Sequence, residues 1–310
     1  MTRRIAALYL VFTHLMTVTC RAEVSPSAVG WGNLLVPGLG ATLRGQPETG
    51  LLEATAEIGL FYGGTFGVRE GGFTIDGSLS LPTSGSFYKP LLGDVMQEFG
   101  LKLHMWDTFY HYQQASLALV DSDREKYNSQ PLYKGGWKDV MSSPFKADYL
   151  TSVWVFPLIL VSSAYLVYDY TTSPLQKLTF ISRPGEDGLY AFSQIGAIPL
   201  GSAFGEEPFF RGFAMREARL YTDSIVVSLV FESTLFTLIH PDDQKLSAFL
   251  SGLYFGLMTN HFKGDIGPAV AAHFWINVVS GITTYLIFKR VQGADTPFAP
   301  PLTASIQIPF

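Results

Sequence analysis

The sequence has 310 residues, of which 47% are hydrophobic, 14% aromatic and only 15% charged. This charged share is well below the roughly 25% of typical soluble domains, so the composition indicates a membrane protein. A formal net charge of -5 and the lack of a lysine- and arginine-rich run exclude nucleic acid as an expected partner, because phosphate binding needs clustered cations.

The N-terminus is predicted to be a targeting segment. Arg3 and Arg4 precede a long apolar run, and Ala22 provides a small residue for cleavage. Residues 1–22 would then be a signal peptide, and an uncleaved signal anchor is the alternative. Cys20 is the only cysteine, so the chain can form neither an internal disulfide nor a cysteine-based metal site.

Residues 23–148 are predicted to form a membrane-associated region with a polar loop section. Residues 25–43 are uncharged but contain P-G-L-G, which favours a bent or re-entrant entry over a straight span. From residue 70 to 148 the composition resembles that of soluble proteins. His104 and His111 in this section would share a helix face. Without carboxylates at ligand spacing, we expect them to be surface or packing residues and not a metal site.

An apolar helix is predicted over residues 51–68. It carries Glu53 and Glu57, which lie one turn apart. We expect these carboxylates to lie at the membrane interface, with pairing to Arg44 or Arg69 as the alternative.

Residues 149–290 are predicted to form a helical membrane core. A helix needs about 20 apolar residues to cross a bilayer, and several segments here are long and apolar enough. The expected fold class is therefore all-α, a polytopic transmembrane helix bundle with catalytic residues on several spans, followed by a proline-rich tail at residues 291–310. The candidate spans are residues 149–168, 188–205, 246–262 and 266–288, with a fifth at 224–240 that is interrupted by Glu232.

Two adjacent glutamates, Glu206 and Glu207, end one uncharged stretch, and Arg211 follows in E-E-P-F-F-R. An ionisable group in a lipid-embedded segment costs several kcal/mol unless it is paired or lines a cavity, so it indicates a functional site. Glu207 and Arg211 are four residues apart and can pair on one helix face. Glu206 would be left free to take a proton from water. Pro208 indicates that the glutamates lie at a helix start or a kink.

Two further apolar stretches each carry a histidine. His273 and Asn277 are four residues apart, so their side chains can together hold the oxyanion of a tetrahedral intermediate. His240 ends another segment and could share or relay a proton with Glu206. Each pattern also has a purely structural explanation, as a buried clamp or as hydrogen bonding between helices. Their occurrence in successive spans favours a proton-transfer site.

These stretches are E-E-P-F-F-R-G at residues 206–212, F-T-L-I-H at 236–240 and H-F-W-I-N at 273–277. In order and spacing they resemble the signature motifs of the type II CAAX prenyl endopeptidase and bacteriocin-processing (CPBP, or Abi) family. The glycine-bearing S-G-L-Y-F-G at residues 251–256 is also typical of that family. The resemblance covers about residues 190–290.

The resemblance implies an intramembrane protease in which Glu206 and His240 activate a water molecule. No cofactor is favoured. Zinc is the alternative, bound by Glu206, His240 and His273. No H-E-x-x-H sequence occurs to support zinc, so we expect a metal-free glutamate mechanism.

The same resemblance implies that Glu207 with Arg211 orients the site and that His273 with Asn277 forms the oxyanion hole. Glu232 departs from the expected pattern, because a small or apolar residue would be typical there. We expect it either to tune the histidine two turns later or to mark a polar cavity.

The leading hypothesis is an endopeptidase that cleaves a membrane-associated peptide or protein, with the lipid bilayer as its other partner. The expected location is a multi-pass position in a membrane, the plasma or inner membrane if the source is bacterial. In family members the substrate can be a prenylated CAAX tail or a bacteriocin leader. One alternative is a non-proteolytic scaffold or bacteriocin-immunity-type protein. Another is a proton-coupled transporter, although paired repeat halves with broken helices are not evident.

Overall fold

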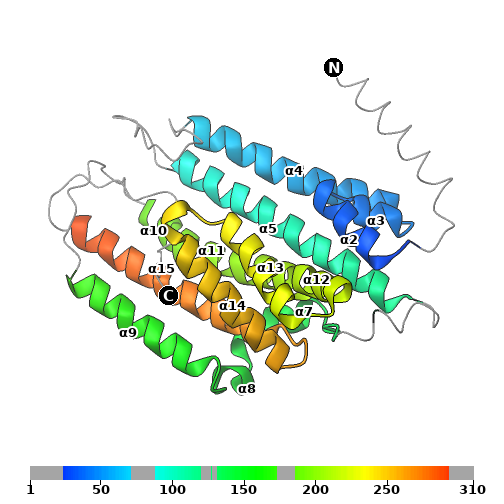
Figure 1. Ribbon diagram of the computed structural model, residues 1–310. Helices are drawn as coiled ribbons and strands as arrows, with labels where there is room; N and C mark the ends of the chain where they lie inside the picture. The colour runs from blue at the N-terminus through cyan, green and yellow to red at the C-terminus, as the bar shows by residue number, and fades with distance from the viewer. Residues whose placement is uncertain (1–23, 71–87, 120–126, 128–130, 173–185, 293–310) are drawn as a thin grey trace.

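The computed structural model describes residues 24–70, 88–119, 127, 131–172 and 186–292. The predicted signal segment at residues 1–22 and almost all of the tail predicted at 291–310 lie outside these ranges. All secondary structure in the described residues is helical, so the predicted all-α class is confirmed (Figure 1).

The described chain begins with two short helices, α2 (Pro26–Leu35) and α3 (Leu39–Leu43). Gly38 separates them with a φ of 76°, and a Cβ at this position would collide with the Gly50 carbonyl. Only glycine adopts this conformation without strain at such a close approach. The predicted bend in residues 25–43 is therefore confirmed.

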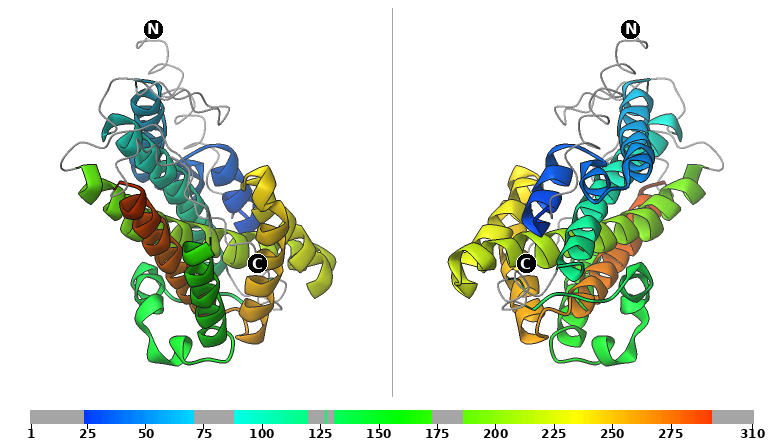
Figure 2. Two further views of the ribbon diagram at one scale, coloured as in Figure 1. Left: turned by 90° about the vertical axis from the view of Figure 1, so that its left-hand side faces the viewer. Right: turned by 90° about the vertical axis from the view of Figure 1, so that its right-hand side faces the viewer.

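Two long helices follow, α4 (Pro47–Glu70) and α5 (Tyr88–Leu117), and they pack along one another (Figures 1 and 2). Most of α5 falls in the stretch whose composition resembles that of soluble proteins. Several of its polar residues pair inside the bundle, among them His104 and His111.

The contacts between α4 and α5 involve the histidines and glutamates singled out in the sequence. His104 Nδ1 lies 2.6 Å from Glu57 Oε2, and His111 Nε2 lies 2.9 Å from Glu53 Oε2. Glu57 is only 3% exposed and His111 is fully buried. The histidines are therefore packing residues, and they pair with the two glutamates, which the sequence did not predict. The position of the glutamates at a membrane interface remains a prediction. Arg44 does join this cluster, through a 2.9 Å contact between its Nη1 and His111 Nδ1.

Short helices connect α5 to the second half of the bundle. The predicted span at residues 149–168 is not one helix, because residues 151–155 form turns and α9 begins at Phe156, immediately before Pro157. A proline fits the first turn of a helix, where its missing N–H is not needed. The elements of this part are α7 (Trp137–Ser142), η1 (Ser143–Phe145), α8 (Ala147–Leu150) and α9 (Phe156–Thr172).

A continuous helical stretch then runs over residues 186–222 and contains three π-helical segments. Pro199 and Pro208 lie within it, and each lacks the N–H that an α-helical hydrogen bond requires. Single wider turns of this kind often occur at functional sites. The stretch contacts α5 on one side and the last helix, α15, on another (Figures 1 and 2). Its elements are α10 (Glu186–Ala191), η2 (Phe192–Ala197), α11 (Ile198–Gly201), η3 (Ser202–Glu206), η4 (Pro208–Ala214) and α12 (Met215–Thr222).

The remaining helices complete the bundle. Helices α13 (Ile225–Leu238) and α14 (Lys245–His261) pack together, with the short turn η5 (Asp242–Gln244) between them, and α15 (Gly267–Gln292) packs against α9. Buried aromatic side chains of α5, η4 and α15 form the main core, including Phe109, Phe213 and Phe274.

One described helical segment, Gly267–Leu286, is long and apolar enough to cross a membrane, and two shorter apolar helices are Phe156–Tyr168 and Ile225–Leu238. The sequence predicted more segments of full length. The difference arises because α9 and α14 each have only 17 residues. Residues 188–205, in turn, are part of a longer helical stretch that includes charged residues.

Candidate active site

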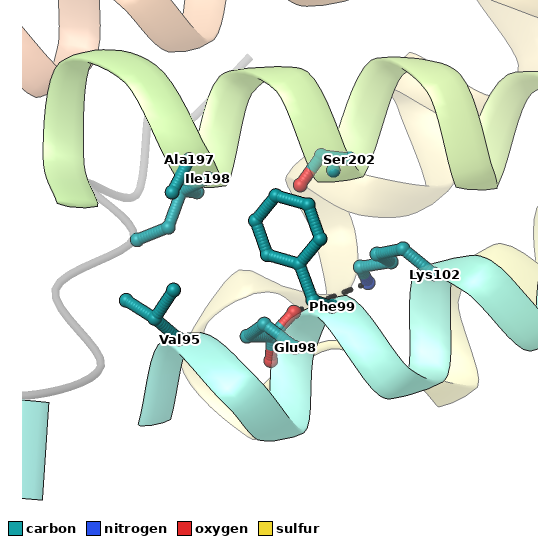
Figure 3. Close-up of a pocket in the computed structure, with 8 residues that line it drawn as sticks. Val95, Glu98, Phe99, Lys102, Ala197, Ile198 and Ser202 are labelled. Carbon is teal, nitrogen blue, oxygen red and sulfur yellow. Dashed lines mark ion pairs between the residues drawn. The ribbon is translucent and has the colours of Figure 1, made fainter. Parts of the chain in front are cut away.

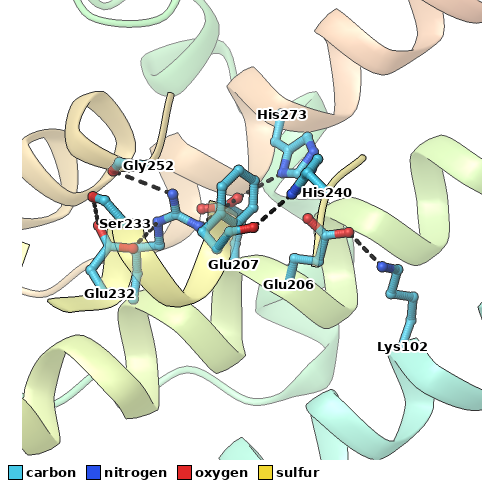
Figure 4. Close-up of polar contacts among 10 residues, drawn as sticks. Lys102, Glu206, Glu207, Glu232, Ser233, His240, Gly252 and His273 are labelled. Carbon is cyan, nitrogen blue, oxygen red and sulfur yellow. Dashed lines mark hydrogen bonds and ion pairs between the residues drawn. The ribbon is translucent and has the colours of Figure 1, made fainter. Parts of the chain in front are cut away.

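Four parts of the chain converge on the two adjacent glutamates. Glu206 ends η3 and Glu207 follows it inside the continuous helical stretch, so the glutamates lie at an irregular helix interior and not at a helix start. Figure 4 shows His240, which follows α13, and His273 of α15 on one side of Glu206, and Lys102 of α5 on the other. The structure thus brings residues from each of the three sequence motifs together, namely the glutamates, His240 and His273, and adds one residue from α5.

Glu207 binds two partners through one oxygen. Its Oε1 accepts a hydrogen bond from Arg211 Nη1 at 3.3 Å and lies 2.6 Å from His273 Nδ1. Arg211 also donates through Nη2 to the Gly252 carbonyl at 3.3 Å. The predicted Glu207–Arg211 pair is confirmed, whereas the contact with His273 was not foreseen. Glu207 is fully buried, so these charge-assisted bonds are shielded from water.

Glu232 lies on the far side of Arg211. Its Oε2 is 3.7 Å from Arg211 Nε, and its Oε1 accepts a hydrogen bond from Ser233. A Cβ at Gly256 would lie 2.5 Å from Glu232 Oε1, so the glycine makes room for the carboxylate. These contacts connect Glu232 with Arg211 and explain one glycine of the S-G-L-Y-F-G stretch.

Aromatic rings enclose the Arg211 guanidinium. Its central carbon lies 4.7 Å from the ring centre of Phe236, 5.3 Å from that of Phe255 and 5.7 Å from that of Phe210. Cation–π attraction at these distances partly replaces the hydration that the buried cation loses. The rings also keep the site apolar around its charged groups, which strengthens each electrostatic contact.

Glu206 is paired with a lysine that the sequence did not indicate. Its Oε1 lies 2.6 Å from Lys102 Nζ. The expectation that Glu206 is left without a partner was therefore wrong. Its second oxygen, Oε2, is buried and has no hydrogen-bond partner among the described residues. One oxygen of this carboxylate is thus held, and the other is available to a ligand or water.

The two histidines have different hydrogen bonds. His240 Nδ1 lies 2.6 Å from the Phe236 carbonyl, which can only accept, so Nδ1 carries the proton and Nε2 of the neutral ring is an acceptor. The ring of His273 stacks on Phe255 with centroids 5.5 Å apart. Both imidazoles lie close enough to Glu206 to interact with it electrostatically.

Asn277 follows His273 by four residues on α15 and is half-buried. The two side chains therefore share a face of this helix, as the sequence predicted. Their use as a joint oxyanion site remains a prediction.

The described residues do not fit the zinc alternative. Among them, no group of three or more histidine, cysteine, aspartate or glutamate side chains could hold a metal ion.

Comparison with known families identifies the part of the chain that contains this site. Residues 189–279 match the family described as type II CAAX prenyl endopeptidase Rce1-like. This part of the chain is an Rce1-like domain. The Rce1-like domain contains every residue of the three motifs, so the family predicted from the sequence is confirmed. Lys102 lies outside the Rce1-like domain. No curated protein and no solved structure matches the chain.

Proposed function

We propose that this protein is an intramembrane endopeptidase that hydrolyses a peptide bond near the bilayer with a glutamate-activated water. The observation that carries the proposal is the arrangement of Glu206 in the Rce1-like domain. Its Oε2 is buried without a hydrogen-bond partner among the described residues, and two histidines lie close enough to interact with the carboxylate. A carboxylate and an imidazole in such a setting can take a proton from water.

In the proposed reaction, water lies between Glu206 Oε2 and His240 Nε2. Both atoms are acceptors, which suits them to orient the water and to remove one of its protons. The water oxygen attacks the carbonyl carbon of the scissile peptide, and the carbonyl oxygen becomes the oxyanion. The hydrogen bond between His240 Nδ1 and Phe236 supports this role, because it fixes the ring with Nε2 free.

His273 and Asn277 are proposed to stabilise the oxyanion. In the proposed step, His273 donates from Nδ1 to Glu207, which fixes the ring, and from Nε2 to the developing charge. The intermediate then collapses as the carbon–nitrogen bond breaks. The proton taken from water passes to the leaving nitrogen, and the products are a carboxylic acid and an amine.

Exposed apolar side chains support a multi-pass membrane location. They lie on α4, α9, α13 and α14, where water would otherwise contact them, and large exposed apolar surfaces mark contact with a membrane or a protein. The proposed location implies lipid contact and a membrane-associated peptide or protein substrate. Examples are Leu52, Phe66, Leu160, Val161, Val167, Val226, Leu238 and Leu246.

The proposal can be tested by comparing the termini of membrane proteins in cells that carry wild-type protein or Glu206→Gln at equal levels. Glu48→Gln is the matched control, because Glu48 is exposed at the start of α4. We expect defined uncleaved precursors to accumulate only with Glu206→Gln. Identical termini in all three strains, together with a phenotype on gene deletion, would instead favour the non-proteolytic scaffold.

A further inference from the structure

Lys102 is a buried cation that the Rce1-like domain does not contain. It lies on α5, and its side chain is only 9% exposed. Its Nζ is 2.6 Å from Glu206 Oε1. A buried lysine costs several kcal/mol of desolvation unless a carboxylate and good geometry compensate it. The pair therefore ties α5 directly to the glutamate that is proposed to activate water.

We propose that Lys102 is a positioning residue for Glu206, an inference that rests on the proposed function. The ammonium holds Oε1 and thereby fixes the rotation of the carboxylate. This leaves Oε2, which has no hydrogen-bond partner among the described residues, directed at the water. A base must be held within hydrogen-bond reach of the proton that it removes. A small misplacement of the base greatly reduces the reaction rate.

The packing of α5 supports this role. A Cβ at Gly205 would lie 2.6 Å from Lys102 Cβ and 2.7 Å from its carbonyl oxygen. The backbones of α5 and η3 therefore approach as closely as glycine permits, directly before Glu206. This close approach places the Lys102 side chain where it can reach the carboxylate.

Lys102 also lies near a second carboxylate, that of Glu98, and the two contacts differ in strength. Glu98 Oε2 lies 3.5 Å from Lys102 Nζ, and its side chain is 46% exposed. Figure 3 shows both residues at a small pocket between α5 and residues 197–202. Glu206 is closer to the ammonium and is buried, so it makes the stronger contact. The Lys102 side chain thus lies between this pocket and the Glu206 carboxylate.

The test compares cleavage kinetics of Lys102→Met and Lys102→Arg, using as substrate a precursor that accumulates with Glu206→Gln. We expect kcat of Lys102→Met to fall by about 10- to 100-fold, part of the roughly 10²- to 10⁴-fold that a positioned base contributes. KM should change little, because the proposed role of Lys102 is to hold Glu206 and not to bind the substrate. Lys102→Arg keeps the charge and should restore most of kcat. Lys245→Met is the matched control, since Lys245 is half-exposed at the start of α14.

Folding is checked by thermal unfolding of each purified variant. Lys102→Met leaves Glu206 buried without its cation, so its Tm should fall, and adding Glu206→Gln should raise it again. A folded Lys102→Met protein with wild-type kcat would overturn the inference while Glu206→Gln still abolished cleavage. If Glu206→Gln also cleaved normally, the proposed function itself would fail.

Discussion

At the scale of single residues, Glu207 connects two side chains that the sequence placed in separate roles. Arg211 and His273 both contact its Oε1. Glu207 therefore orients the His273 ring in addition to pairing with the arginine. Glu232 gives Arg211 a second, more distant carboxylate.

This arrangement predicts that Glu207→Gln impairs cleavage more than folding. The amide keeps nearly the same shape, and Arg211 keeps Glu232 as a partner, so the variant should remain folded. His273 loses its negative partner, and we expect the cleavage rate to fall by about 100-fold or more. Cleavage assays and thermal unfolding of Glu207→Gln, with Glu48→Gln as control, measure both effects. A rate within about twofold of wild type would show that the charge of Glu207 does not matter to the reaction.

At the scale of secondary-structure elements, the π-helical segments and their glycines position the site against α5. The sequence predicted an apolar helix ending at the glutamates and a disturbance at Pro208. The sequence could not predict the three π-helical segments, because these depend on how neighbouring helices pack as well as on the prolines. The start of α9 was missed as well, since residues 149–155 are apolar enough for one helix, but α8 ends at Leu150 and residues 151–155 form turns.

Two neighbouring glycines allow this positioning to be tested. A Cβ at Gly205 would collide with the Lys102 backbone, whereas a Cβ at Gly201 would lie 3.4 Å from Lys102 Cγ, an ordinary contact. We expect Gly205→Ala to lower the free energy of unfolding by about 1–3 kcal/mol, the usual cost of overpacking, and to reduce cleavage. Gly201→Ala should be neutral or slightly stabilising, because alanine favours helix. Thermal unfolding of both variants measures these changes in stability. Equal changes in the two variants would count against a close contact at Gly205.

At the scale of the whole molecule, the Rce1-like domain depends on helices outside it. Helix α5 contributes Lys102 to the site, and α4 holds α5 through the contacts of Glu57 with His104 and of Glu53 with His111. The motifs within the domain could be predicted from the sequence, because i and i+4 spacing already places their side chains together. Lys102 could not be paired with Glu206 in this way, because the contact depends on how distant helices pack. The one local signal was the spacing of Glu98 and Lys102, which places a charge pair on a long helix.

In the proposed mechanism, Glu206 activates water for direct attack on a peptide bond. The most direct measurement is a single turnover by purified wild-type protein in lipid vesicles, in water enriched in ¹⁸O, with a precursor identified from the Glu206→Gln cells as substrate. The account predicts one ¹⁸O atom in the new C-terminal carboxyl group of the product and none in Glu206. Incorporation of ¹⁸O into the Glu206 side chain would contradict it, because the glutamate would then have attacked the substrate itself.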